Sequence, residues 1–296
     1  MTSRRSLAGA LVLTTALAAC GADAATRDRT ARATTAQSQQ AACPSKGRHA
    51  IGGGVLRIPP GAKPGATRLL VVVIPSGTGD PGDHLRLARP ADAAHLALLY
   101  PTQKGGRFWQ LNDAEGTSDV TNVSDTLDKV LATGCFDARR VSITGVSNGA
   151  GFAARMGCAR PDRFAAVIPV AAGYRALDPC PATARAWFLD IHGTADTVVP
   201  YRGKAPDFKG NVPRFTGRWA RRDGCSTSAR ASHPQRLVTH FTYGGCDGGR
   251  RVEAFRLSGT QHGWPGSIGR FTRPNPSRFQ AAPAVVRFAR AARLSG

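Results

Sequence analysis

A serine between two glycines, at the point where a strand leads into a helix, most constrains how this chain folds. Gly145, Ser147 and Gly149 follow a β-branched run and precede the helix-compatible stretch 150–160, which stops at Pro161. The turn is so sharp that a side chain at either glycine position would press against the neighbouring strand or helix. A turn of this kind lifts the serine hydroxyl clear of the backbone, where a base and a substrate both reach it. The pattern predicts a nucleophile elbow at Ser147.

A serine nucleophile needs a base, and the base needs an orienting carboxylate. When the serine lies on such an elbow, the acid comes next along the chain and the histidine last. Asp196 lies just past the apolar, strand-like run 186–191, on the loop edge where catalytic groups collect. Asp190 lies inside that run, where an unpaired carboxylate would be costly. We therefore expect Asp196 to be the acid.

His262 is the expected base, because it stands among glycines after the strand-like run 252–257. His192, at the end of the strand before Asp196, is expected to buttress the acid loop. Of the other histidines, three precede the serine and have the wrong order, and two lack flanking glycines and are expected on the surface or in strands. The three before the serine are His49, His84 and His95, and the two without flanking glycines are His233 and His240.

Strand candidates alternate with helix candidates along the chain, which predicts an α/β fold with a mostly parallel sheet and helices on both faces. The predicted strands are 55–58, 69–74, 96–100, 141–144, 165–170, 187–191 and 252–257. Apolar residues at helical spacing predict a helix up to Leu131. A last helix is expected over about 283–294, and the segments 76–83 and 201–214 are expected to be loops over the active face.

Three motifs together resemble the poly(3-hydroxybutyrate) depolymerase and feruloyl esterase family. They are Gly-Val-Ser-Asn-Gly at 145–149, His-Gly-Thr-Ala-Asp-Thr-Val-Val-Pro-Tyr at 192–201, and Gln-His-Gly-Trp-Pro-Gly at 261–266. The resemblance covers residues 43–296 and implies an α/β-hydrolase fold. It also implies that Ser147 is the nucleophile, Asp196 the acid and His262 the base.

The expected oxyanion donors are the backbone N–H groups of Asn148 and Thr78. The family usually has His-Gly after its early central strand, and here Ser76 stands where that histidine is expected. Trp264, two residues after the base, is expected to form a wall of the substrate pocket. Trp109 is assigned equally to the core or the pocket.

These residues predict carboxylic ester hydrolysis through an acyl-enzyme, with no metal and no organic cofactor. The substrate stays open among polyesters, feruloyl-type esters and small acyl esters. A serine peptidase of the same fold is one alternative, although the chain has no added propeller-sized domain to gate peptides. A non-catalytic, envelope-binding lipoprotein is the other, and the complete triad order weighs against it.

The N-terminus has the pattern of an export signal. Residues 1–19 carry two arginines and then an apolar run, which predicts a signal peptide, and the run is too short for a permanent membrane span. It ends in Leu-Ala-Ala-Cys-Gly, which resembles a bacterial lipobox, so Cys20 is expected to carry a lipid that anchors the exported protein to the membrane. An ordinary signal peptide is the alternative. Residues 20–42 have no apolar period and are expected to be a disordered tether ahead of a catalytic domain at 43–296.

Setting Cys20 aside leaves an even number of the seven cysteines, which in an exported protein suggests three disulfides. Six cysteines allow 15 connectivities. Proximity and the resemblance together suggest Cys43–Cys135, Cys158–Cys180 and Cys225–Cys246. The last pair comes shortly before His262 in the sequence, so we expect its loss to disturb the base as well as the fold.

The formal net charge is +21. The arginines are scattered, with no basic run and no interleaved aromatic motif, so nucleic acid is not an expected partner. Anionic lipid headgroups or acidic envelope polymers are the more plausible partners of such a charge. A composition-biased genome with solvated arginines explains the charge equally well.

Overall fold

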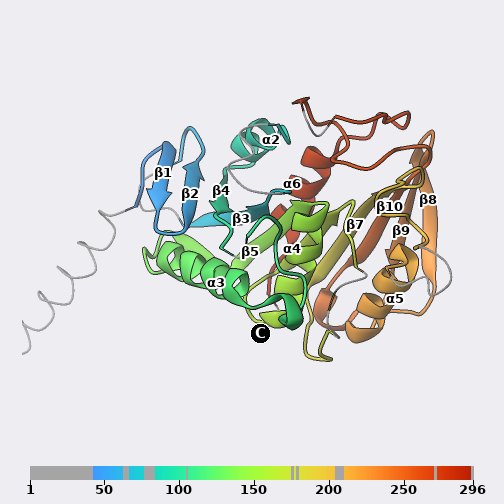
Figure 1. Ribbon diagram of the computed structural model, residues 1–296, viewed down its shortest axis with the longest axis horizontal. Coiled ribbons are helices and arrows are strands. Elements are labelled where there is room, and N and C mark those ends of the chain that lie inside the picture. The colour runs from blue at the N-terminus through green and yellow to red at the C-terminus, as the bar shows by residue number, and fades with distance from the viewer. Residues whose placement is uncertain are drawn as a thin grey trace, which may run out of the picture. The chain divides into compact units, whose positions relative to one another are not determined.

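The computed structural model describes residues 43–62, 67–76, 84–104, 106–174, 177, 180–203, 210–269 and 272–294 (Figure 1). The chain divides into two units, Met1–Gln39 and Gln40–Gly296, and all described residues belong to the second. The predicted signal peptide, Cys20 and the tether therefore lie outside the described residues. So does Thr78, and all of these stay predictions. Among the residues that are described, no helix is both long and apolar enough to cross a membrane.

The described strands form one ten-stranded sheet, in the order β1-β2-β4-β3-β5-β6-β7-β10-β9-β8. From β4 to β10 all neighbouring strands run parallel, and antiparallel strands extend the sheet at both edges. The strands are β1 (Gly47–Ile51), β2 (Gly54–Ile58), β3 (Arg68–Ile74), β4 (Leu96–Pro101), β5 (Phe136–Val146), β6 (Ala166–Val170), β7 (Trp187–Gly193), β8 (Ala229–Gln235), β9 (Val238–Tyr243) and β10 (Val252–Leu257).

Helices cover both faces of this sheet (Figure 1). One apolar cluster packs α3, α4 and α5 against one face, and a second cluster packs α2 and α6 against the other. The described helices are α2 (Ala88–Ala93), α3 (Ser118–Leu131), α4 (Asn148–Ala159), α5 (Val212–Arg222) and α6 (Ala281–Ala291), with 3-10 turns η1 (Asp113–Glu115) and η2 (Asp247–Gly249). This is the predicted α/β architecture.

All the predicted strands are present, and the additional elements are the less apolar ones. Strands β1, β8 and β9 and helices α2 and α5 were not predicted. The segment 201–214, expected to be a loop, overlaps the start of α5. Asn211 caps this helix, since its side chain accepts a hydrogen bond from the Arg214 N–H at 3.0 Å.

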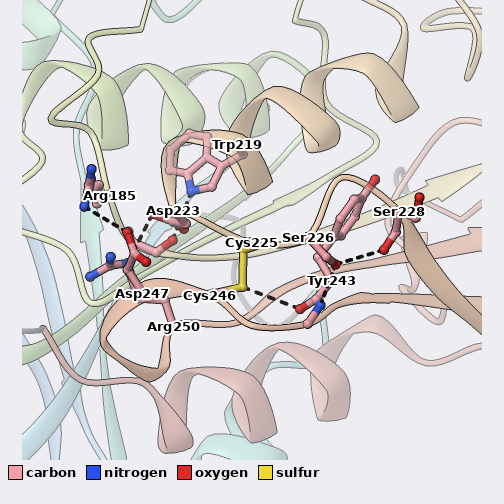
Figure 2. The surroundings of a disulfide bond; sticks show 12 residues. Arg185, Trp219, Asp223, Cys225, Ser226, Ser228, Tyr243, Cys246, Asp247 and Arg250 are labelled. Carbon is pink, nitrogen blue, oxygen red and sulfur yellow. Dashed lines mark hydrogen bonds and ion pairs between the residues drawn. A yellow bond between two sulfur atoms is a disulfide. The ribbon is translucent and has the colours of Figure 1, made fainter.

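Three disulfides join the described cysteines in the suggested pairs, Cys43–Cys135, Cys158–Cys180 and Cys225–Cys246. The third ties the end of α5 to the residue just before η2 (Figure 2). This bridge lies at the end where β10 begins, whereas His262 follows the end of β10. Six strand residues separate the two, about 20 Å. The bridge therefore lies at the opposite end of β10 from the base, and its effect on the base stays a prediction.

Candidate active site

Ser147 lies between the last residue of β5 and the first residue of α4, in a strained backbone conformation. Its φ of 58° and ψ of −123° are unusual for a residue with a side chain. The flanking glycines permit this turn. A Cβ at Gly145 would lie 2.5 Å from the Gly149 carbonyl oxygen, and a Cβ at Gly149 would lie 2.4 Å from the carbonyl oxygens of Ile74 and Pro75. The backbone thus packs too closely for any residue but glycine.

Ser147, His262 and Asp196 are joined by hydrogen bonds. His262 Nε2 is 2.8 Å from Ser147 Oγ, and His262 Nδ1 is 2.7 Å from Asp196 Oδ2. Because an ionised carboxylate only accepts, Nδ1 carries the hydrogen, and Nε2 of the neutral ring is free to accept the serine proton. The Asp196 side chain is fully buried, whereas that of His262 is 17% exposed.

The acid is held ionised by its surroundings. Asp196 Oδ1 accepts hydrogen bonds from the N–H groups of Val198 at 3.0 Å and Val199 at 2.7 Å. Burial by itself would raise the pKa of Asp196, but hydrogen bonds from His192 and His262 outweigh it, and the pKa lies well below its usual value. The carboxylate is therefore ionised at neutral pH.

Parallel pairing of β7 with β10 brings the acid loop and the base loop together. Ala195 N–H donates to the Thr260 carbonyl at 3.0 Å, and Gly259 N–H donates to Thr194 Oγ1 at 3.0 Å. A Cβ at Gly193 would lie only 2.1 Å from the Thr260 carbonyl oxygen. The two loops are in backbone contact, which fixes the position of His262 relative to Asp196.

Known proteins resemble the chain over this region. A family model described as "Esterase PHB depolymerase" matches residues 54–174. A bifunctional acetylxylan esterase/xylanase of Neocallimastix patriciarum is 26% identical over 182 residues, 58% of this chain and 25% of that protein. Feruloyl esterase B of Piromyces equi is 26% identical over 185 residues, 58% of this chain and 34% of that protein. The match thus spans between a quarter and about a third of these relatives.

The fold has counterparts among solved structures. An acetyl xylan esterase from Aspergillus awamori superposes with a TM-score of 0.57 at 17% identity, covering 74% of this chain and 94% of that one. Over part of its length the chain therefore resembles esterases of the poly(3-hydroxybutyrate) depolymerase and feruloyl esterase type. Its fold is that of the α/β-hydrolases.

Asn148 begins helix α4, and its side chain fixes a neighbouring loop. Asn148 Oδ1 accepts from the Trp109 N–H at 2.8 Å, and Asn148 Nδ2 donates to the Trp109 carbonyl at 3.1 Å. Its backbone N–H lies in the first turn of the helix, where the N–H groups of an α-helix are not used within the helix. The position suits an oxyanion donor, and that role stays a prediction.

The two tryptophans lie in the core. Trp109 and Trp264 are each only 1% exposed. Trp109 stacks on Phe152, with ring centroids 4.8 Å apart, and its Nε1 donates to the Pro75 carbonyl at 2.8 Å. Trp264 belongs to the apolar cluster that includes α6. Of the two assignments for Trp109, the core is correct, and the expectation that Trp264 walls the pocket is wrong because its ring is enclosed by packing.

Two exposed apolar side chains belong instead to segments that hydrogen-bond to Asp196 or to the residue after Ser147. Phe108 is 57% exposed and precedes the residue held by Asn148, and Val198 is 62% exposed and donates its N–H to the catalytic-acid candidate. Sequence reasoning missed both, because an apolar residue in a loop carries no signal of exposure. Their nearness to the triad elements was the only available clue.

Arg155, on α4, was also missed, and it holds the loop that follows Trp109. It is 4% exposed, and its Nη1 donates to the carbonyls of Gln110 at 2.8 Å and Gly116 at 2.9 Å. Its Nη2 contacts Asp113 Oδ1 at 2.6 Å. Within the described residues, no group of three or more His, Cys, Asp or Glu side chains is arranged to hold a metal ion.

Proposed function

We propose that this protein hydrolyses carboxylic esters through an acyl-enzyme on Ser147. The observation that carries the proposal is the hydrogen-bonded chain from Ser147 through His262 to the buried, ionised Asp196. The strained backbone at Ser147 supports it, because strain of this kind persists where function requires it. The resemblance to known esterases adds independent support.

In the first half of the reaction, Ser147 Oγ attacks the ester carbonyl carbon while His262 Nε2 takes the hydroxyl proton. The bond to the alcohol oxygen then breaks, and His262 returns the proton to the departing alcohol. In the second half, a water molecule attacks the acyl-serine with His262 again taking a proton. That proton passes to Ser147 Oγ as the carboxylic acid leaves. Asp196 fixes the histidine tautomer and stabilises the imidazolium in both halves.

The oxyanion formed in each half would be held by the backbone N–H of Asn148 and, as second donor, that of Thr78. The N-terminus of α4 adds a favourable dipole for a negative charge beside Ser147. Loss of one such donor costs about 10²–10³ in rate in comparable enzymes. The mechanism uses no metal or organic cofactor.

The relatives named above suggest the first substrates to examine. One is named as an acetylxylan esterase and another as a feruloyl esterase, so acetyl and feruloyl esters of carbohydrate alcohols come first. Poly(3-hydroxybutyrate) follows from the description of the matching family. Phe108 and Val198 supply the exposed apolar surface that an acyl or aromatic group would contact.

A fluorophosphonate probe gives the direct test. The wild-type protein should be labelled and should hydrolyse p-nitrophenyl acetate, and Ser147→Ala should lose both properties while keeping its circular dichroism spectrum. A panel of acetylated xylan, methyl ferulate and short polyester then identifies the substrate class. A folded wild-type protein that neither reacts with the probe nor hydrolyses any ester would refute the proposal.

We also propose that the protein is exported and anchored through a lipid on Cys20. The disulfides are typical of an oxidising compartment outside the cytosol. The motive for the lipid is the Leu-Ala-Ala-Cys sequence at the end of the apolar run. Radioactive palmitate should label the protein in cells, and Cys20→Ser should remove the label. The net charge of +21 would further favour anionic lipid or envelope polymers.

A further inference from the structure

Behind the triad, on the face of β7 that packs against α5, lies a second set of buried polar side chains. Asp190 and His192 are two residues apart on β7 and so share one face of the strand, and both side chains are completely buried. His192 Nε2 lies 2.8 Å from the Val199 carbonyl oxygen and 3.2 Å from Asp196 Oδ2. A carbonyl oxygen only accepts hydrogen bonds, so this nitrogen carries a hydrogen.

The other ring nitrogen faces a second carboxylate. His192 Nδ1 lies 4.0 Å from Asp190 Oδ1, and among the described residues neither atom has a hydrogen-bond partner. Asp190 Oδ2 accepts a hydrogen bond from the Tyr174 hydroxyl, so Oδ1 is the oxygen left facing the ring. With a hydrogen on Nδ1 the two groups form an ion pair. Without one, two buried acceptors would face each other unsatisfied, which is unfavourable.

Besides the two carboxylates, the titratable neighbours of His192 are Tyr201 and Arg256, and neither supplies a negative charge. The Tyr201 ring lies 5.9 Å away, and burial raises the pKa of Tyr201 to about 12, so it is neutral. Arg256 is the β10 neighbour of His192, but its Nη2 donates to Thr239 on β9 at 3.1 Å. Two carboxylates, Asp190 and Asp196, therefore share the imidazole of His192.

The pKa directions agree with this reading. Burial alone would lower the pKa of His192, but the hydrogen bond to Asp196 and the charge of Asp190 raise it above its ordinary value. Burial raises the pKa of Asp190 to about 6, against the effects of His192 and Tyr174. Above about pH 6 the Asp190 carboxylate is mostly ionised, and the raised pKa of His192 favours the imidazole that carries a second hydrogen.

We propose that His192 is a positively charged positioning residue, held protonated by Asp190 and acting on the reaction only through Asp196. The inference rests on the proposed esterase function. The positively charged His192 and the base His262 both contact the same oxygen, Asp196 Oδ2. It weakens the attraction that would hold a second proton on His262, so the base is free to accept the serine proton down to lower pH.

The pH profile of kcat/KM tests this inference. His192→Gln keeps an N–H donor for the Val199 carbonyl but has no charge, and its acid limb should move to higher pH by about one unit. Asp190→Asn should move the acid limb in the same direction, because His192 then loses its second hydrogen and with it the charge closest to Asp196. If His192 were neutral throughout, Asp190→Asn would remove only a negative charge, and the limb would move to lower pH or stay in place. Either of those results overturns the proposal.

Two further variants keep the test decisive. His240→Gln is the matched control, since His240 Nε2 also contacts a carboxylate, Glu253, at 2.8 Å on neighbouring strands away from Asp196. Its acid limb should not move. If Asp190→Asn fails to fold, Tyr174→Phe replaces it, because the ring that stacks on Phe215 stays and only the hydrogen bond to Asp190 is lost. A smaller shift in the same direction is expected, and an unchanged limb would count against the proposal.

Nitrogen-15 NMR of Ser147→Ala separates this inference from the esterase proposal, since it requires no turnover. The His192 signals, assigned by their loss in His192→Gln, should show hydrogen on both ring nitrogens across pH 6–8. An unprotonated Nδ1 at pH 7 would refute a charged His192 even in an active esterase. Two protonated nitrogens in a protein without esterase activity would refute the proposed function alone.

Discussion

Strands β7 and β8 are each seven residues long and belong to the same sheet, yet they differ in almost every other respect. All of β7 after its first residue is buried, whereas all of β8 after its first residue is exposed. Strand β7 and the loop that follows it carry Asp190, His192 and Asp196, and β8 lies at the edge of the described sheet beside β9. The comparison teaches that the candidate chemistry lies where burial is most complete, because there carboxylates and imidazoles interact with each other rather than with water.

The largest expected effect comes from Ser147, which follows the buried end of strand β5. Ser147→Ala should reduce kcat for p-nitrophenyl acetate by about 10⁴–10⁶, since the groups of a triad act as one unit. Ser232→Ala, on the exposed strand β8, is the matched control and should leave kcat unchanged. Steady-state kinetics with circular dichroism as a folding check measures both. Wild-type turnover in Ser147→Ala would mean that another residue is the nucleophile.

The same contrast explains what the sequence could predict. The elbow could be predicted because Gly145 and Gly149 are required: a Cβ at either position would lie 2.4–2.5 Å from a carbonyl oxygen, and that requirement leaves a fixed pattern in the sequence. The apolar strands were readable because they are buried on both faces. Strand β8 was missed because an exposed edge strand needs neither an apolar run nor an alternation, and a proline such as Pro234 is tolerated mainly in edge strands.

Helix α5 and the core tryptophans were missed for a different reason. Helix α5 buries Phe215 and Trp219 beneath an arginine-rich outer face, and only its packing on β7 and β10 reveals which side is inside. Trp264 follows His262 closely in sequence but points into the other apolar cluster. Sequence proximity gives no direction for a side chain in a loop.

A glycine exchange sharpens the comparison. Gly193→Ala, at the end of β7, would place a Cβ 2.1 Å from the Thr260 carbonyl and force the acid and base loops apart. A displacement of about 1 Å at such a site costs about 10²-fold in kcat/KM, and the overpacking costs about 1–3 kcal/mol of stability. Gly244→Ala, close to the end of β9, meets no atom within 4 Å and should change neither quantity. Equal effects of the two exchanges would contradict the close loop contact.

Removing a disulfide from the edge region should affect stability and leave chemistry nearly intact. Cys225→Ser with Cys246→Ser opens a bridge with a sequence separation of 21 and should cost about 2–4 kcal/mol in urea unfolding. We expect kcat/KM of the folded variant to stay within about two-fold of wild type, because β10 separates the bridge from His262. A large loss of kcat/KM in a fully folded variant would show that the edge hairpin and the active site are coupled.

A buried acid beside that disulfide should make stability depend on pH. Asp223 lies against Arg250 Nε at 3.2 Å (Figure 2), and burial raises its pKa to about 7 despite the opposing effect of Arg250, Arg222 and Arg185. The folded state therefore prefers the protonated acid. This contribution to stability is complete below about pH 4, the pKa of an unfolded aspartate, and is lost as the pH rises through about 7.

Asp223→Asn should remove this loss, so its unfolding free energy should fall less between pH 5 and pH 7 than that of the wild type. The difference in slope should be at most about 1.4 kcal/mol per pH unit. Urea unfolding at several pH values measures it. Asp247→Asn, whose carboxylate is 55% exposed, should keep the wild-type slope. Identical slopes in the wild type and Asp223→Asn would place the proton uptake elsewhere.

The smallest expected effect concerns two exposed apolar side chains, one in each region. Val198, 62% exposed beside Asp196, has the position of a substrate contact, and Leu237, 38% exposed, lies in the turn between β8 and β9. Val198→Ala removes two methyl groups from the surface that would meet the acyl or alcohol group, so KM should rise about five-fold at nearly constant kcat. Leu237→Ala should leave KM unchanged. The ratio of the KM of Val198→Ala to that of the wild type should grow with the apolar size of the substrate, since a larger group covers more of the exposed side chain. If KM in Val198→Ala is unchanged for every ester in the panel, the substrate approaches Ser147 without contacting the acid loop. Of Val198 and Phe108, only Phe108 would then remain as a candidate substrate contact.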